Sequence, residues 1–287
     1  MSSAAKPRID AAAIAADARS KLSRFQQIHP LRSAGIGGRA WLYRRTPGRS
    51  SEQLPAVMVP GIQGGGDVFF EAALVLGDRI PVITLSAPDI EDVTEISSDL
   101  VDFLRAIGVA RANFVGSSLG GYLAQSVALR SPEMVEQLVI ANGSIDISTF
   151  VEKLPPAATV AATDAAKLVE QSLQPLLAKP AFDEGQVRLK TALKALVGVV
   201  QTLENFKSRL LLAMGAPQLA VPSIPPERVM IIDDDHDPML PPEMREAVRK
   251  RFRRSEQHAI DGGGHLPAIQ RPAQFADLLW RRLARDD

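Results

Sequence analysis

Short apolar runs that alternate with helical patterns are the feature that most constrains the fold of this chain. The run PAVMV at residues 55–59 is apolar at successive positions, so both faces of a strand there are expected to be buried. Helical spacing separates such runs, as where Leu100, Leu104 and Ile107 share one face ahead of Gly108. Strands buried on both faces and separated by helices predict an α/β fold with a parallel sheet. The strand-like runs are residues 39–44, 55–59, 82–85, 113–115, 138–141, 229–232 and 257–260.

The segment at residues 145–221 departs from this alternation, because it holds two or three amphipathic helical patterns and no strand-like run. We therefore predict a core made of residues 1–144 and 222–287, in which residues 1–28 are a helical extension, and a helical cap inserted between them. Open α/β sheets bind ligands at the carboxyl ends of their strands, so a cap there would form a ligand cavity. The alternative is that the insertion only pads the edge of the sheet.

A serine between glycines lies where a strand-like run passes directly into a helical pattern. In the letters NFVGSSLGGYLAQ, Gly116, Ser118 and Gly120 form the pattern G-x-S-x-G. Glycines at this spacing relieve crowding in a sharp turn that aims the central side chain out of the sheet. We therefore predict Ser118 as a nucleophile, whereas Ser117 is expected to be a small hydroxyl that fills the turn.

A serine hydroxyl needs a base to take its proton and an acid to orient that base. In this strand-turn-helix architecture both partners follow the serine along the chain. His265 follows the last strand-like run and three glycines, which predicts it as the base. The other three histidines fit this position less well: His29, His236 and His258.

The acid is sought in the letters VMIIDDDHDPMLPP, after the strand-like run at residues 229–232. Asp237 stands in the loop where the carboxylate is expected, so we predict it as the acid. Asp234 and Asp235 are expected to bond nearby backbone amides in a turn. Asp146, just past the run at residues 138–141, is the alternative acid. The same acidic cluster could be read as a metal site, but adjacent residues cannot all turn toward one ion, so no metal is expected.

Negative charge on a carbonyl oxygen under attack is stabilised by preorganised N–H groups, which form an oxyanion hole. One donor is expected to be the Leu119 amide, directly after the nucleophile. The loop VPGIQGGGDVFF after the run at residues 55–59 is expected to supply the other from Ile62, with Gln63 next to it as a substrate contact. Asp67 is expected to cap the helix that follows this loop.

Composition excludes several classes of function. There is no cysteine, so neither thiolate catalysis nor a disulfide framework is available. The chain carries 33 basic and 33 acidic residues, and this balance gives no reason to expect a nucleic acid or an anionic membrane as partner. No apolar run approaches the length of about 18 residues that a membrane span needs, and no signal-peptide pattern is present, so a cytoplasmic location is expected. The glycine loop lacks the pattern of a phosphate or dinucleotide site, so no cofactor is expected.

These features together resemble the α/β-hydrolase superfamily, which implies an eight-stranded, mostly parallel sheet with a helical cap. Within it, GGGDVFF (64–70), GSSLGGYLAQ (116–125) and LVIANGSIDISTF (138–150) resemble maspardin-like proteins, over a match from about residue 29 onward. Vertebrate members of that group carry another residue at the position of the base and are thought to act by binding proteins. This chain departs from them by keeping His265, which favours an enzyme.

The sequence therefore predicts a serine hydrolase that cleaves a carboxylic ester or thioester. The substrate is expected to be a small acyl compound, and the alanine, leucine and valine content of the cap favours one with an apolar group. Two alternatives stay open. One is another reaction on the same residues, such as perhydrolysis or C–C bond hydrolysis, because fold does not dictate function. The other is a non-catalytic protein that binds a protein partner, as the maspardin resemblance implies.

Overall fold

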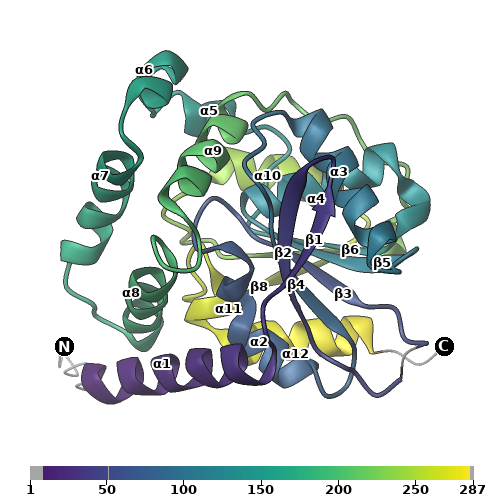
Figure 1. The fold of residues 1–287 in the computed structure, drawn as a ribbon, viewed down its shortest axis with the longest axis horizontal. Helices are drawn as coiled ribbons and strands as arrows, with labels where there is room; N and C mark the ends of the chain where they lie inside the picture. Colours follow the sequence, from purple (N-terminus) through teal and green to yellow (C-terminus); the bar gives the residue numbers. More distant parts are fainter. Residues whose placement is uncertain (1–8, 51, 285–287) are drawn as a thin grey trace, which may run out of the picture.

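A computed structural model describes residues 9–50 and 52–284 of the chain. Within these residues, eight strands form one sheet in the order β1-β2-β4-β3-β5-β6-β7-β8 (Figure 1). The pairs β1–β2 and β2–β4 are antiparallel and the others are parallel. The predicted fold class, an α/β fold with a mostly parallel eight-stranded sheet, is confirmed. The strands are β1 (Arg32–Ile36), β2 (Arg39–Arg45), β3 (Ala56–Val59), β4 (Val82–Ser86), β5 (Ala112–Ser117), β6 (Val135–Ala141), β7 (Val229–Asp233) and β8 (Glu256–Ala259).

Successive residues of the central strands belong to two different cores, one on each face of the sheet. In β3, Val57 and Val59 pack in one apolar cluster, while Ala56 and Met58 pack in the other. The first cluster is covered by α3 (Val93–Ala106), α4 (Leu119–Arg130) and α10 (Pro242–Arg251). The second is covered by α1 (Ala11–Ile28), α2 (Phe70–Leu76), α11 (Pro267–Gln270) and α12 (Pro272–Leu283), so helices flank the sheet on both sides (Figure 1). Because both faces of β3 are buried, its sequence is apolar at every position.

Side-chain caps fix where several helices begin. The carboxylate of Asp10 accepts a hydrogen bond from the Ala13 N–H at the start of α1, and Asp92 accepts one from the Glu95 N–H at the start of α3. Such caps satisfy backbone N–H groups that have no partner within the first helical turn. No helix in the described part of the chain is both long and apolar enough to cross a membrane.

Strand β1 was not among the strand-like runs, because its sequence RSAGI has little apolar character and most of its residues are exposed. It forms by pairing with β2 through a tight hairpin. Gly37 and Gly38 lie at φ values of 55° and 82°, which is the backbone of a two-residue hairpin turn that favours glycine. The Gly-Gly pair was therefore the available sequence signal for this strand.

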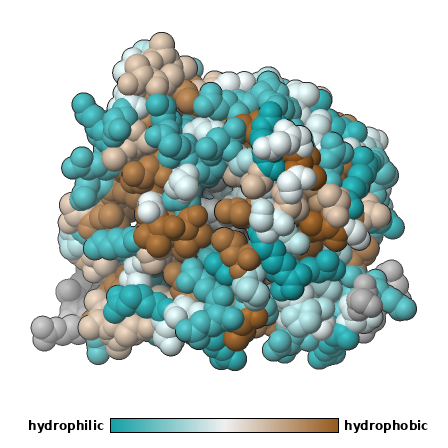
Figure 2. All heavy atoms as spheres, in the orientation of Figure 1, coloured by the Kyte–Doolittle hydropathy of each residue, from teal (hydrophilic) through white to brown (hydrophobic). Residues whose placement is uncertain are grey.

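The region between β6 and β7 is helical, as predicted for most of it, but it holds more helices than the two or three expected. Its helices are α5 (Ser148–Val151), α6 (Ala157–Ala162), α7 (Ala165–Ala178), α8 (Glu184–Leu196) and α9 (Leu203–Met214). They lie together on one side of the molecule (Figure 1), and apolar residues gather on the face seen in Figure 2. We call residues 145–221 the cap segment; its division from the core, with boundaries at residues 144 and 222, stays a prediction.

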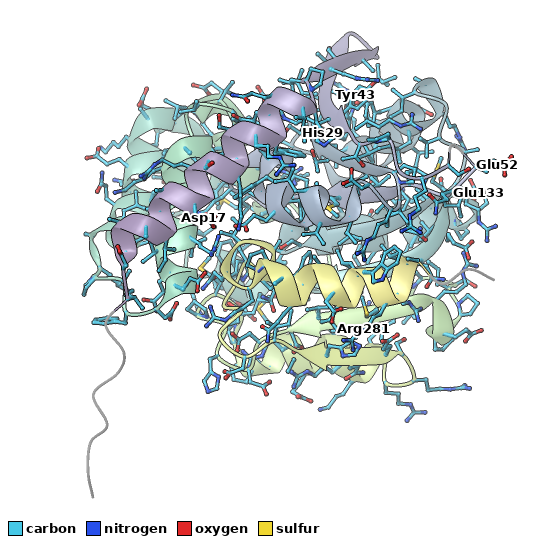
Figure 3. All side chains as sticks on the ribbon, turned by 90° about the horizontal axis from the view of Figure 1, so that it is seen from below. Asp17, His29, Tyr43, Glu52, Glu133 and Arg281 are labelled. Atoms are coloured by element: carbon cyan, nitrogen blue, oxygen red, sulfur yellow. The ribbon has the colours of Figure 1, made fainter. Side chains whose placement is uncertain are left out.

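Helix α1, predicted as an extension, packs against both α2 and the cap segment. Arg188 of α8 binds Asp17 of α1, Glu71 of α2 and Glu184 of its own helix, at 2.9, 2.7 and 2.8 Å. Figure 3 shows α1 from below, with Asp17 part of the way along the helix and His29 at its C-terminal end. Phe25 of α1 is completely buried, so the helix contributes to the core on that face of the sheet.

Candidate active site

The turn at Ser118 joins β5 to α4, and two glycines make it possible. Ser118 has a φ of 56° and a ψ of −124°, a backbone conformation that is strained for any residue with a side chain. A Cβ at Gly116 would lie 2.3 Å from the Gly120 carbonyl oxygen, and one at Gly120 would lie 1.9 Å from the Val59 carbonyl oxygen. Both distances are too short for any atom, so the backbone of this turn requires glycine at the two flanking positions. The turn places Ser118 at the carboxyl end of β5.

Three of the predicted residues form one hydrogen-bonded path. His265 Nε2 lies 2.8 Å from Ser118 Oγ, and His265 Nδ1 lies 2.8 Å from Asp237 Oδ2 and 3.1 Å from Asp237 Oδ1. Asp237 lies in the loop after β7, and His265 lies in the loop after β8. Both loops start at the carboxyl ends of their strands, and they bring together residues that are far apart in the chain. The imidazole is 16% exposed and the carboxylate is fully buried, so the Asp237 end of the path is closed to solvent.

The environment of Asp237 keeps it ionised. Burial alone would raise the pKa of its carboxyl, but the hydrogen bond and charge of His265 and the N–H groups of Met239 and Leu240 outweigh burial and lower that pKa below its ordinary value. The carboxylate is therefore an acceptor at neutral pH. It fixes Nδ1 of the imidazole as the protonated nitrogen, which leaves Nε2 as an acceptor toward Ser118.

The loop of His265 is held by Asn142, which the sequence analysis did not single out, and by Asp234, which it expected only as a turn residue. The Gly264 N–H donates to Asp234 Oδ2 at 2.6 Å, and Asn142 Nδ2 donates to the Gly264 carbonyl oxygen at 2.6 Å. Asn142 Oδ1 also accepts from the Asp234 N–H at 3.2 Å, so the loops after β6, β7 and β8 are joined. Asn142 has a φ of 43°, and the Asn-Gly pair after β6 was the sequence signal for such a turn.

The remaining acidic and imidazole side chains are engaged elsewhere. Asp233 and Asp235 both bind Arg249, and Asp234 accepts from the His236 N–H in the predicted turn. Asp146, the alternative acid, accepts from the Ser148 N–H. His236 is exposed and His258 binds Glu256. Across residues 9–50 and 52–284, no group of three or more His, Asp or Glu side chains is placed to hold a metal ion.

The loop after β3 runs beside the serine. A Cβ built on Gly61 would lie 3.0 Å from Ser118 Cβ, so this loop touches the turn directly. In the described part of the chain, the N–H groups of Ile62 and Leu119 donate to no protein acceptor. Gln63, the predicted substrate contact, is half-buried and likewise makes no side-chain hydrogen bond there.

The expectation that Asp67 caps a helix after this loop is wrong. Asp67 lies within a short 3-10 helix, η1 (Gly65–Phe69), and its buried carboxylate binds the guanidinium of Arg44 at 2.8 and 3.2 Å. Gln26 of α1 donates to the same carboxylate at 2.9 Å. The ion pair with Arg44 is stronger than a hydrogen bond to a helix N-terminus, so the Asp67 carboxylate binds Arg44 instead. Because Arg44 lies 23 residues away in the chain, no local sequence pattern indicates this pairing.

Two residues of the cap segment also reach the loop after β3 and were missed. Gln201 bonds the Ile62 carbonyl and the Gly64 N–H, and Arg209 bonds the carbonyls of Pro60 and Gly61. Both lie in or beside the amphipathic pattern of α9, where polar residues are usually on the solvent side. Only the tertiary structure reveals that these two are buried.

Comparisons with known proteins agree with this architecture. A family model described as the alpha/beta hydrolase family matches residues 56–278. The chain is similar to the putative carbamate hydrolase RutD of Cronobacter turicensis, with 25% identity over 240 residues that cover 79% of this chain and 90% of RutD. It is also similar to maspardin of Danio rerio, with 27% identity over 236 residues that cover 79% of this chain and 73% of maspardin.

Among solved structures, a hydrolase from Pseudomonas aeruginosa PA01 has a TM-score of 0.68 to this chain at 21% identity, covering 88% of this chain and 98% of that one. The predicted resemblance to this superfamily and to maspardin-like proteins is thus confirmed. Because the family model matches well over half of its residues, this chain belongs to the alpha/beta hydrolase family.

Proposed function

We propose that this protein is a serine hydrolase that cleaves a carboxylic ester or thioester through an acyl-enzyme. The observation that carries the proposal is the continuous hydrogen-bonded path from Ser118 through His265 to Asp237, with 2.8 Å between successive partners. A serine in this arrangement has a base within reach of its proton, and the base has a carboxylate to orient it.

In the first half of the reaction, Ser118 Oγ attacks the substrate carbonyl carbon while His265 Nε2 accepts the hydroxyl proton. The buried carboxylate of Asp237 stabilises the imidazolium that forms. His265 then gives the proton to the leaving alcohol or thiol, and the acyl group stays on Ser118. In the second half, His265 accepts a proton from water as the water attacks the acyl-enzyme. His265 then returns this proton to Ser118 Oγ while the acyl–oxygen bond breaks and the acid is released.

The N–H groups of Leu119 and Ile62 stabilise the negative charge that develops on the substrate's carbonyl oxygen. Leu119 is the first residue of α4, so its N–H belongs to the positive end of that helix. Both N–H groups are free of protein acceptors in the described residues, which supports this assignment. Gln63, next in the loop, is the proposed substrate contact.

The substrate is proposed to be a small acyl compound with an apolar group. The apolar residues gathered on the face of the cap segment support this class (Figure 2). RutD, similar over most of this chain, is named a putative carbamate hydrolase, so a carbamate belongs in a substrate panel beside esters and thioesters of increasing acyl length.

A fluorophosphonate probe, followed by that panel, tests the proposal. The wild-type protein is expected to be labelled, and Ser118→Ala is expected to lose both labelling and turnover. Ser117→Ala is the matched control, because Ser117 is buried beside Ser118 and its hydroxyl has no partner in the described residues. His265→Ala should lower kcat by about a millionfold, the effect of removing histidine from the subtilisin triad.

Equal labelling of wild type and Ser118→Ala would contradict the assignment of the nucleophile. A folded wild-type protein that neither reacts with the probe nor turns over any substrate would contradict hydrolysis altogether. That result would favour the non-catalytic, protein-binding role that maspardin-like proteins suggest.

A further inference from the structure

Arg209 of α9 is buried, with 2% of its surface exposed, and has no acidic partner in the described part of the chain. Its Nη2 donates to the carbonyl oxygens of Pro60 and Gly61, at 2.9 and 3.2 Å. Its Nη1 is buried without an acceptor in the described residues. Burial lowers the pKa of the guanidinium to about 10, so the group still carries its charge at neutral pH.

A buried cation without a counter-ion is costly to a folded protein, and two backbone carbonyls compensate for only part of that cost. An apolar side chain at this position would avoid the cost. The burial of a cation here therefore needs an explanation other than stability, and its two acceptors lie in the loop that runs beside Ser118.

The hydrogen bond from Arg209 to the Gly61 carbonyl sets the direction of the Ile62 N–H group. The Gly61 carbonyl and the Ile62 N–H belong to the same planar peptide unit, and in a trans peptide they point in opposite directions. The described residues contain no cis peptide bond. A donor that holds the Gly61 oxygen therefore also fixes the direction of the Ile62 N–H.

Gln201 holds the next peptide of the same loop. Its Nε2 donates to the Ile62 carbonyl oxygen at 2.7 Å, and its Oε1 accepts from the Gly64 N–H at 2.7 Å. The side chain is 3% exposed, so water does not compete for these bonds. Arg209 and Gln201 together fix the loop on both sides of the Ile62 N–H.

We propose that Arg209, with Gln201, is a positioning residue for the oxyanion hole, and this inference rests on the proposed function. Arg209 orients the Gly61–Ile62 peptide and places a positive charge behind it, at the carbonyl end of the peptide dipole. That charge attracts the full negative charge that develops on the oxygen during attack more strongly than it attracts the neutral carbonyl of the bound substrate. Binding energy that appears only in the transition state raises kcat and leaves KM nearly unchanged.

The decisive experiment compares Arg209→Met and Arg209→Lys with the wild type on one p-nitrophenyl ester. Arg209→Met is expected to lower kcat by about tenfold to a hundredfold, the scale of a small misplacement of a catalytic group, with KM changed by less than about threefold. Arg209→Lys keeps the charge and one donor, so it is expected to recover most of the lost kcat. Lys207→Met is the matched control, because Lys207 on the same helix donates to the Thr163 carbonyl, which lies outside this loop.

Gln201→Met tests the same inference without removing a charge, and it decides the matter if the Arg209 variants do not fold. It is expected to lower kcat with little change in KM. Wild-type kcat in folded Arg209→Met or in Gln201→Met, or a change in KM alone, would overturn the inference and leave the proposed function standing. Failure of the wild type to react with the fluorophosphonate probe or with any substrate would overturn both.

Discussion

The side-chain amide of Asn142 holds the carbonyl oxygen of Gly264 at 2.6 Å, across 122 residues of chain. This bond supports the residue just before His265 from the end of β6, which is separated from β8 by β7 in the sheet. Asp237, His265 and the residues that support them thus come from the loops after β6, β7 and β8. The imidazole is therefore placed by the loop backbone as well as by its own contacts with Asp237 and Ser118.

Replacing Asn142 by glycine should lower turnover more than substrate binding. Glycine keeps the positive φ at this position without strain, so the variant removes the amide and little else. Loss of the buried hydrogen bonds is expected to lower the free energy of unfolding by about 1–3 kcal/mol. Looser placement of His265 is expected to lower kcat by about tenfold to a hundredfold. Steady-state kinetics and urea denaturation check both effects, and an unchanged kcat would show that the loop needs no such support.

Replacing Gly120 by alanine should strongly destabilise the folded protein. The added Cβ would lie 1.9 Å from the Val59 carbonyl oxygen, so α4 would have to move away from β3. A destabilisation of at least about 4 kcal/mol is expected, which is exceptional for a single substitution. Gly35→Ala is the control, since its Cβ would meet no atom closer than 3.9 Å, and its effect is expected to stay within about 0.5 kcal/mol. Similar urea midpoints for the two variants would contradict this account.

Tyr122 should make the protein sensitive to alkali. Burial, and then the charge of Asp146, raise the pKa of its phenol to about 12, and its hydroxyl donates to the Pro217 carbonyl. An unfolded tyrosine has a pKa of about 10, so the stabilisation is complete below pH 10 and is lost as pH rises toward the folded value. Tyr122→Phe lacks this titration. The difference in free energy of unfolding between wild type and Tyr122→Phe should therefore become less favourable to the wild type above pH 10, and a constant difference would refute the assignment.

Arg188 should be needed for the attachment of α1 and the cap segment to α2. Among the described residues, Arg188→Met leaves the buried carboxylate of Glu71 with only Lys21, at 3.2 Å, so the free energy of unfolding should fall by about 3 kcal/mol. The double variant Arg188→Met, Glu71→Leu removes the stranded charge and is expected to recover most of this loss. Urea denaturation of the wild type and both variants measures the difference, and a double variant less stable than the single one would contradict it.

The sequence predicted the fold and the hydrogen-bonded path because both depend on local signals. Apolar runs indicated the doubly buried strands, and the two glycines around Ser118 indicated a turn packed so closely that neither position has room for a Cβ. Strand β1 had no apolar signal, because pairing with β2 forms it rather than burial. The choice of Asp237 over its neighbours followed from its place in the loop, and the structure gives each of the other three aspartates another partner.

The supporting residues could not be predicted, because their partners are distant in the chain. Asp67 binds Arg44, and Gln201 and Arg209 reach a loop about 140 residues upstream. A polar residue in an amphipathic helical pattern is predicted to be exposed to solvent. Its neighbours within one helical turn do not indicate whether an arginine side chain is buried or solvated. These contacts depend on the way the cap segment packs against the core.

The bond between Arg209 and Gly61 bears on how new specificity could be engineered into this protein. A chimera that took residues 145–221 from a relative would exchange the support of the loop after β3 together with the helices of the cap segment. Its turnover number would then change along with its substrate preference, unless the donor segment brought an arginine and a glutamine to the same two peptides.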